Sequence, residues 1–108
     1  MRAEALKGHL DGLLLAVLDR GPAHGYAVIE ALRAHSAGAF DLPTGTVYPA
    51  LHRLEEQGFV ASTWSDGDGR RRRTYRLTAQ GRKALRDQRT TWTEFARAVT
   101  AVLAGGTT

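Results

Sequence analysis

Apolar residues recur every three or four positions near the start of the chain and predict a helix from about Glu4 to Arg20. The residues that give this helix a broad apolar face are Leu6, Leu10, Leu13, Leu14, Val17 and Leu18. Gly21-Pro22 ends the helix, because glycine suits a helix C-terminus and proline cannot continue the backbone hydrogen bonds. A second, shorter helix is predicted over residues 25–35.

The next segment contains a break, a short extended stretch and a third helix. Ala37-Gly38-Ala39 ends the second helix, and residues 40–42 are long enough for one short strand. The third helix is predicted to end near Gly58. Because Pro49 has no N–H, it fits best in the first turn of that helix, which favours Thr46 or a near neighbour as the N-cap.

Alternating side chains over residues 60–64 and again over residues 74–77 predict the two strands of a hairpin. The residues between them, 65–69, contain two Asp-Gly pairs. Such pairs supply the positive φ angles that tight hairpin turns require. Thr78 follows the second strand and is predicted to cap a last helix from about Ala79 to Leu103.

The last helix carries an unusual apolar seam. Two series of residues, each with a spacing of seven and offset by three, are Leu85, Trp92 and Val99, and Gln88, Phe95 and Val102, with Gln88 as a polar break. This seam packs either on its own domain or on a second chain. A helix of roughly 25 residues spans about 37 Å, more than so small a domain covers, which favours a second chain. The predicted homodimer interface comprises Leu6, Leu10, Leu85, Trp92, Phe95, Val99 and Val102.

Composition and charge narrow the function. The chain has 108 residues, the size of one domain, and no cysteine, which excludes disulfides and thiolate metal sites. No apolar run is long enough for a membrane span or typical of a secretory signal, so we expect a cytoplasmic protein. Nine of the 15 Lys and Arg residues lie between Arg70 and Arg89. A cationic surface so concentrated is either a solvated face or, the favoured interpretation, a phosphate-binding one. No motif supports an enzyme, a cofactor or a metal site.

The order helix, helix, short strand, helix, hairpin, helix is that of a winged helix-turn-helix domain: mainly α with a small β-hairpin, here with an added C-terminal dimerisation helix. We assign residues 1–78 to the winged domain with its N-terminal helix, 79–104 to the dimerisation helix and 105–108 to a disordered tail. In such domains the third helix enters the major groove and the hairpin lies along the DNA backbone. The third helix presents outward hydrogen-bond donors at Thr44, Thr46, Tyr48, His52 and Arg53. Its later residues Glu55 and Glu56 repel phosphates, so its N-terminal half is predicted to face DNA.

Several motifs together resemble the PadR-like transcriptional regulators. They are His24-Gly25-Tyr26, the segment 45–55 (GTVYPALHRLE), Gly58, Trp64, the segment 69–75 (GRRRRTY) and the segment 77–81 (LTAQG). The resemblance spans about Leu10 to Leu103. It implies a bacterial-type repressor that dimerises through its last helix, assisted by its first, and binds near-palindromic operators in double-stranded DNA. It also implies release by small molecules such as phenolic acids or planar drugs.

The same resemblance implies roles for individual residues. Tyr26 would brace the second helix against the backbone, Thr44, Thr46 and Tyr48 would begin the recognition helix, and Arg70, Arg71, Arg72 and Arg73 would form the wing at the hairpin tip. This arginine run is denser than the family pattern requires, and strand alternation places its members on two faces. An aromatic residue at the position of Trp92 lines a ligand cavity at the dimer interface of some members.

Alternatives remain for several of these residues. Tyr48 is equally well explained as an aromatic that packs between helix and hairpin, and Trp92 as a plain interface anchor. At the level of the whole chain, the leading hypothesis is a dimeric, sequence-specific DNA-binding repressor. The alternatives are a winged-helix module that binds a protein partner without DNA, and a protein that packages nucleic acid without sequence preference.

Overall fold

The computed structural model describes residue 6, residues 8–67 and residues 69–105, and within them the chain is mainly helical with a small sheet. The elements are α1 (Leu10–Asp19), β1 (Ala23–His24), α2 (Gly25–His35), α3 (Thr44–Glu56), β2 (Val60–Gly67), β3 (Arg70–Leu77) and α4 (Ala79–Leu103). The strands form an antiparallel sheet in the order β1-β3-β2. This is the mainly α, winged helix-turn-helix architecture that the sequence predicts.

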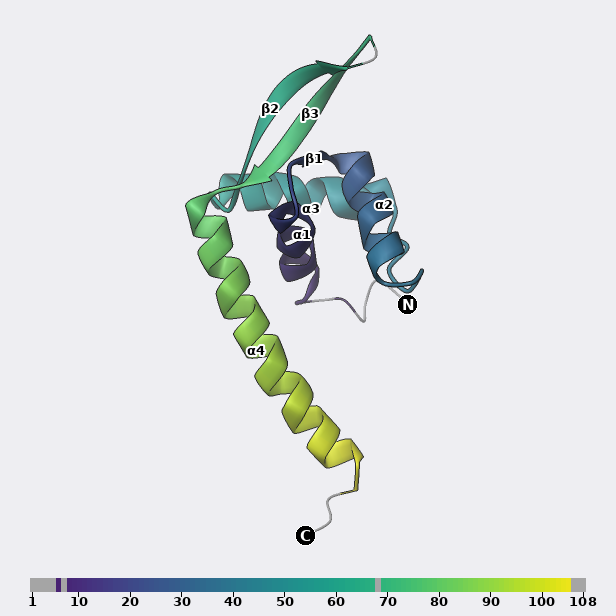
Figure 1. Cartoon of the computed structure of the whole chain (residues 1–108), viewed down its shortest axis with the longest axis vertical. Coiled ribbons are helices and arrows are strands. Elements are labelled where there is room, and N and C mark those ends of the chain that lie inside the picture. Colours follow the sequence, from purple (N-terminus) through teal and green to yellow (C-terminus); the bar gives the residue numbers. More distant parts are fainter. Residues whose placement is uncertain (1–5, 7, 68, 106–108) are drawn as a thin grey trace.

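Two parts project from a body of helices (Figure 1). The β2–β3 hairpin extends on one side, and α4 extends on the other, so the chain measures 62 × 28 × 20 Å along its principal axes. The body is formed by α1, α2, α3 and the base of the sheet, and α1 packs against α2, α3, β3 and α4. Its fully buried side chains come from nearly every element: Leu14, Val28, Val47, Leu51, Leu54, Val60 and Tyr75.

The structure confirms two of the predicted helices, α2 and α4, and shows that the first helix is shorter than predicted. Helix α2 has the predicted bounds, and α4 begins after Thr78, whose Oγ1 accepts a hydrogen bond from the N–H of Gly81 at 3.0 Å. The first helix begins at Leu10 rather than near Glu4, which lies outside the described residues. Gly8 has a φ of +87°, and this left-handed conformation interrupts the helical path.

Two predictions about the segment before α3 are wrong. Residues 40–42 form no strand; the short strand is β1, which pairs Ala23 with Tyr75 and so becomes an edge of the wing sheet. Helix α3 begins at Thr44, and not after an N-cap at Thr46, because the Pro43 carbonyl already accepts bonds from the N–H groups of Thr46 and Val47. Pro49 is therefore inside the helix, where it leaves one carbonyl of the first turn without its usual donor.

The hairpin is longer than the alternation of side chains predicted. Strand β2 continues to Gly67, which pairs with Arg70, so the predicted loop 65–69 is mostly strand. Gly69 has a φ of +74° at the turn, as an Asp-Gly hairpin turn requires. Arg70 to Arg73 thus all lie in β3, where alternate side chains point to opposite faces.

The start of α4 depends on a close approach that only glycine allows. A Cβ atom on Gly81 would overlap the backbone carbonyl oxygen of Phe59. Gly81→Ala should therefore lower the free energy of unfolding by about 1–3 kcal/mol, measured by urea denaturation. The matched control is Gly45→Ala in the first turn of α3, where a Cβ would meet open space. That change should be neutral or stabilising by up to about 1 kcal/mol; equal losses at both positions would contradict the steric explanation.

Candidate nucleic-acid interface

The N-terminal half of α3 presents polar side chains at the surface. Thr44 is exposed, Thr46 and Tyr48 are half-buried, and His52, just past the middle of the helix, is exposed. The N–H groups of Thr44 and Gly45, which precede the first bonded N–H of the helix, point out of its end, where the dipole favours an anion such as a phosphate. This half of α3 therefore has the donors and the electrostatic character that the sequence predicts for a DNA-facing helix.

Two of the predicted contact residues of α3 also make contacts within the chain. Tyr48 is half-buried and its ring lies over Gly25 of α2, where a Cβ atom would overlap it. Arg53 is exposed, but its Nη2 donates to Oδ1 of Asp11 in α1 at 2.8 Å. Tyr48 thus packs two helices together, and Arg53 is turned toward α1; their roles toward DNA remain predictions.

The start of α2 connects the body to the wing through His24. Its Nδ1 accepts a hydrogen bond from the N–H of Ala27 at 3.3 Å and so caps α2. Its Nε2 lies 3.1 Å from Nη1 of Arg72. A neutral imidazole offers one acceptor nitrogen and arginine only donates, so these two contacts require opposite tautomers of His24 and compete with each other. Tyr26, two residues further on, is 57% exposed and available to a ligand.

One face of the hairpin carries two arginines on either side of a tryptophan. Trp64 pairs directly with Arg73 in the strand register, and Arg71 is two residues along the same face. The guanidinium carbons of Arg71 and Arg73 lie 5.0 and 5.4 Å from the Trp64 ring, within the range of cation–π attraction. Trp64 is itself 54% exposed, so this face of the wing is open to a ligand.

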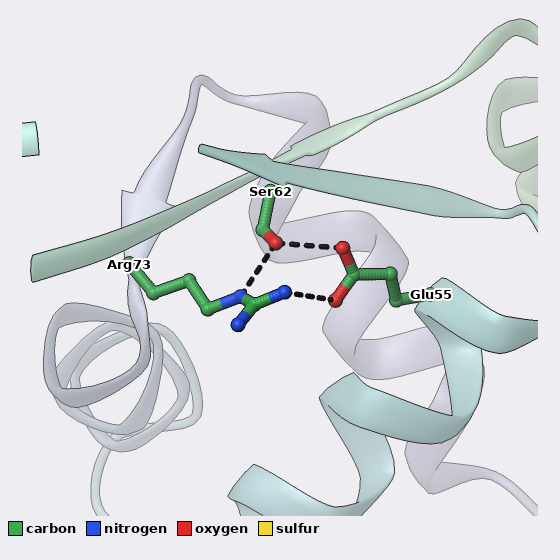
Figure 2. Close-up of polar contacts among 3 residues, drawn as sticks. All are labelled: Glu55, Ser62 and Arg73. Carbon is green, nitrogen blue, oxygen red and sulfur yellow. Dashed lines mark hydrogen bonds and ion pairs between the residues drawn. The ribbon is translucent and has the colours of Figure 1, made fainter. Parts of the chain in front are cut away.

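Arg73 also joins the wing to α3 (Figure 2). Its Nε donates to Oγ of Ser62 at 2.7 Å, and its Nη2 lies 3.5 Å from Oε1 of Glu55. The Ser62 hydroxyl in turn donates to Oε2 of Glu55 at 2.6 Å. Three side chains from α3, β2 and β3 therefore form one network at the base of the hairpin.

The predicted wing arginines accordingly have different surroundings. Arg70 and Arg71 are exposed and form no ion pair with any described residue, Arg72 is half-buried beside His24, and Arg73 is held by Ser62 and Glu55. Close to this network, burial raises the pKa of the Tyr75 hydroxyl above its ordinary value, Arg73 lowers it, and Glu55 and Tyr48 raise it further. The neutral hydroxyl form is thus favoured in the folded chain.

A second candidate site is a groove of about 490 Å³ between α1 and the first half of α4. Its aromatic wall consists of His9, Trp92 and Phe95; the His9 and Trp92 rings meet edge to face at 5.2 Å, and Trp92 and Phe95 lie 5.9 Å apart. Trp92 and Phe95 are both about half exposed. The groove has the size and apolar character of a small-molecule site.

The predicted dimer residues fall into two groups. Leu6 and Leu85 are buried in the chain's own core, and Leu10 packs partly against it. Further along α4, Val99 is half-buried and Val102 is 78% exposed. Val99 and Val102 thus belong to the part of the seam that the body of this chain does not cover.

Sequence reasoning missed five residues of these two sites: His9, Asp11, Ser62, Trp64 as an arginine platform, and Glu55 as an arginine partner. Strand alternation could have revealed some of these contacts. Once the register of the hairpin is known, it places four side chains on a single face: Ser62, Trp64, Arg71 and Arg73. Within the described part of the chain, no helix is long and apolar enough to cross a membrane, and no three His, Asp or Glu side chains gather as metal ligands.

Comparisons with known proteins agree with this geometry. Residues 14–87 match the sequence pattern of the transcriptional regulator PadR-like family. The chain is 42% identical over 76 residues to the transcriptional regulator Rv3488 of Mycobacterium tuberculosis, covering 70% of this chain and 68% of that protein.

Solved structures give the same result. A PadR family transcriptional regulator from Eggerthella lenta superposes with a TM-score of 0.83 at 35% identity, covering 95% of this chain and 88% of that one. A PadR-like regulator from Bacillus cereus gives a TM-score of 0.83 at 25% identity, covering 95% and 99%. The family consists of regulators that bind DNA and not of enzymes. The chain belongs to the PadR-like family of transcriptional regulators.

Proposed function

We propose that this protein is a homodimeric repressor that binds a near-palindromic operator in double-stranded DNA, acts in the cytoplasm and is released by a flat aromatic ligand. The observation that carries the proposal is the open first turn of α3 together with an arginine-lined hairpin anchored to the same helix. In a winged helix-turn-helix these two elements read the major groove and follow the backbone.

Charge and hydrogen-bond chemistry support the DNA contacts. Thr44, Thr46 and His52 offer donors or acceptors that base edges can use, and the half-buried Tyr48 places its ring beside them. Arg70 and Arg71 are exposed on β3, and a guanidinium matches a phosphate with two parallel hydrogen bonds. Tyr26, at the start of α2, is exposed, and its proposed role is to hold α2 against the DNA backbone.

The exposed seam of α4 supports a homodimer. The far half of α4 extends away from the body (Figure 1), and Phe95, Val102 and Leu103 expose large apolar surfaces there. An apolar stripe of this kind on one helix marks an interaction surface. Two copies that pack these stripes together, with α1 at the edge of the contact, present two recognition helices to two half-sites.

The groove beside Trp92 supports ligand control. Its walls come from both α1 and α4, so a planar aromatic ligand that stacks on Trp92 changes how these two helices meet. Because α4 is also the proposed dimer helix, such a ligand biases the geometry of the dimer and with it the affinity for the operator.

DNA binding is tested by titrating the protein against duplex DNA from upstream of its own gene and against fragments selected from genomic DNA. If about six phosphates are contacted, affinity should fall about a thousandfold between 50 and 200 mM salt. Arg70→Ala should weaken all sequences alike, whereas Thr46→Ala should relax base preference. The control is Arg97→Ala on the distal half of α4, which should bind as the parent does. Binding of no duplex at all, with α4 still capturing a partner protein, would support the protein-interaction module instead.

The repressor role needs its own measurement. A reporter placed behind the selected promoter should become less active when the protein is expressed, and activity should return with Thr46→Ala. A reporter that becomes more active would identify an activator.

Dimerisation is tested by Val102→Glu, followed by sedimentation velocity at micromolar concentration. Val102 is 78% exposed in the single chain, so the substitution leaves the core intact while it buries a charge in the proposed interface. We expect a dimer for the parent and a monomer for Val102→Glu. Ala101→Glu, one position off the seam, should stay dimeric; a parent that sediments as a monomer refutes the proposal.

Ligand binding is tested in a Trp64→Phe variant, because Trp92 is then the only tryptophan of the chain. Planar aromatic compounds should quench its emission and lower the affinity for operator DNA, and Trp92→Ala should abolish the second effect. Unchanged emission across a panel of such compounds would leave Trp92 as an interface anchor only.

A further inference from the structure

We propose that Glu55, Ser62, Arg73 and Trp64 form a strut that fixes the hairpin to the recognition helix, and that Arg73 is a positioning residue and not a phosphate contact. The inference rests on the proposed DNA binding. It assigns different roles to the arginines of β3. Arg71 is the arginine that the strut positions for DNA, and Arg70 lies beyond it on the opposite face of β3.

The strut is a continuous series of contacts from α3 outward along one hairpin face (Figure 2 shows its base). Glu55 contacts Ser62 at 2.6 Å and Arg73 at 3.5 Å, and the Arg73 guanidinium lies 5.4 Å from the Trp64 ring. The Arg71 guanidinium lies 5.0 Å from the same ring. Each side chain thus contacts the next, and the last one reaches the exposed end of the wing.

The hairpin needs such a support because little else holds it. A two-stranded ribbon is marginally stable by itself. The outer part of the hairpin, where β2 ends and β3 begins, is mostly exposed, and β1 pairs only with Thr74 and Tyr75 of β3. The strut begins where that pairing ends. It therefore restricts the angle between wing and α3, and that angle decides whether both reach one duplex together.

Two of the three donor nitrogens of Arg73 already have partners. Its Nε and Nη2 point to Ser62 and Glu55, and the Glu55 carboxylate neutralises part of its charge. A phosphate that binds Arg73 through Nε and Nη2 has to displace these partners, whereas Arg71 has no ion pair among the described residues. Arg73 should therefore contribute much less counterion release than Arg71.

A change at Glu55 distinguishes the proposal from simple electrostatic repulsion, because the two predict opposite changes in affinity for DNA. If its carboxylate only repels phosphates, Glu55→Gln strengthens DNA binding. If it anchors Arg73, Glu55→Gln weakens DNA binding because the wing loses its fixed angle. Glu56 is the matched control: it is the next residue of α3, is exposed, and its side chain forms no hydrogen bond or ion pair with any described residue.

The experiment measures affinity for a selected operator duplex at several salt concentrations. Glu55→Gln should lower affinity about three- to tenfold, in the range of coupling within one network, while Glu56→Gln should leave it unchanged or raise it. Arg73→Lys should lower it similarly, because lysine keeps the charge but cannot hold Ser62 and Glu55 together as the guanidinium does. Arg73→Gln should also lower it, with a salt slope close to that of the parent. Arg71→Gln should reduce the slope by about one, and Arg71→Lys should largely restore it.

A second measurement does not involve DNA. In a Trp92→Phe variant Trp64 is the only tryptophan, and Glu55→Gln or Arg73→Lys should increase its quenching by acrylamide, since Arg73 no longer lies beside the ring. Thermal melting checks that each variant is folded.

The outcomes separate the two proposals. A chain that binds no duplex refutes the DNA-binding proposal, and the quenching result then decides whether the strut exists. If the parent binds DNA, a gain in affinity for Glu55→Gln, or a slope change for Arg73→Gln equal to that for Arg71→Gln, overturns the strut.

Discussion

The central position of α1 is the constraint on which the other parts of the molecule depend. It packs against α2, α3, β3 and α4 and buries its leucines there, so one ten-residue helix joins α3 and the wing, the proposed DNA-facing elements, to the long C-terminal helix. Two exposed ion pairs, Asp11 with Arg53 of α3 and Asp19 with Arg89 of α4, lie near opposite ends of α1. Such pairs contribute little stability, but they orient α1 toward both neighbours. Burial of the apolar face of α1 is what holds the surrounding elements together.

The arginine run shows why a count of charges does not describe an interface. All four residues look equivalent in the sequence, yet strand alternation and pairing give them different surroundings. Arg72 lies beside a half-buried imidazole, Arg71 beside an indole ring, and Arg73 beside the same ring, a serine and a carboxylate, while Arg70 is exposed. A cation held by a carboxylate adds less to the field that attracts DNA than one facing solvent. In the proposed assignment, the density of the run serves two tasks, attraction of phosphate and stiffness of the element that carries the charge.

Local patterns in the sequence predict the parts of this fold that local physics determines. Helix α2 and helix α4 with its Thr78 cap follow from periodicity and capping, and the hairpin from alternation around Asp-Gly pairs. Strand β1 could not be predicted, because its two residues become a strand only by pairing with Thr74 and Tyr75, some fifty positions away. The same holds for the site: the contact of Glu55 with Arg73 needs the register of the hairpin and the angle of α3, which no single segment encodes.

The junction at the base of the wing determines how a change in α4 reaches DNA. The Thr78 hydroxyl donates to the Gly58 carbonyl at 2.6 Å, the Thr78 N–H donates to the Phe59 carbonyl at 3.1 Å, and Gly81 fits against the same carbonyl. The end of α3, the start of β2 and the first turn of α4 therefore form one close-packed unit. Because packed units of this kind shift as rigid bodies, a tilt of α4 carries α3 and the wing with it. In the proposed dimer, a ligand beside Trp92 then alters the spacing between the two DNA-reading units and leaves each unit itself unchanged.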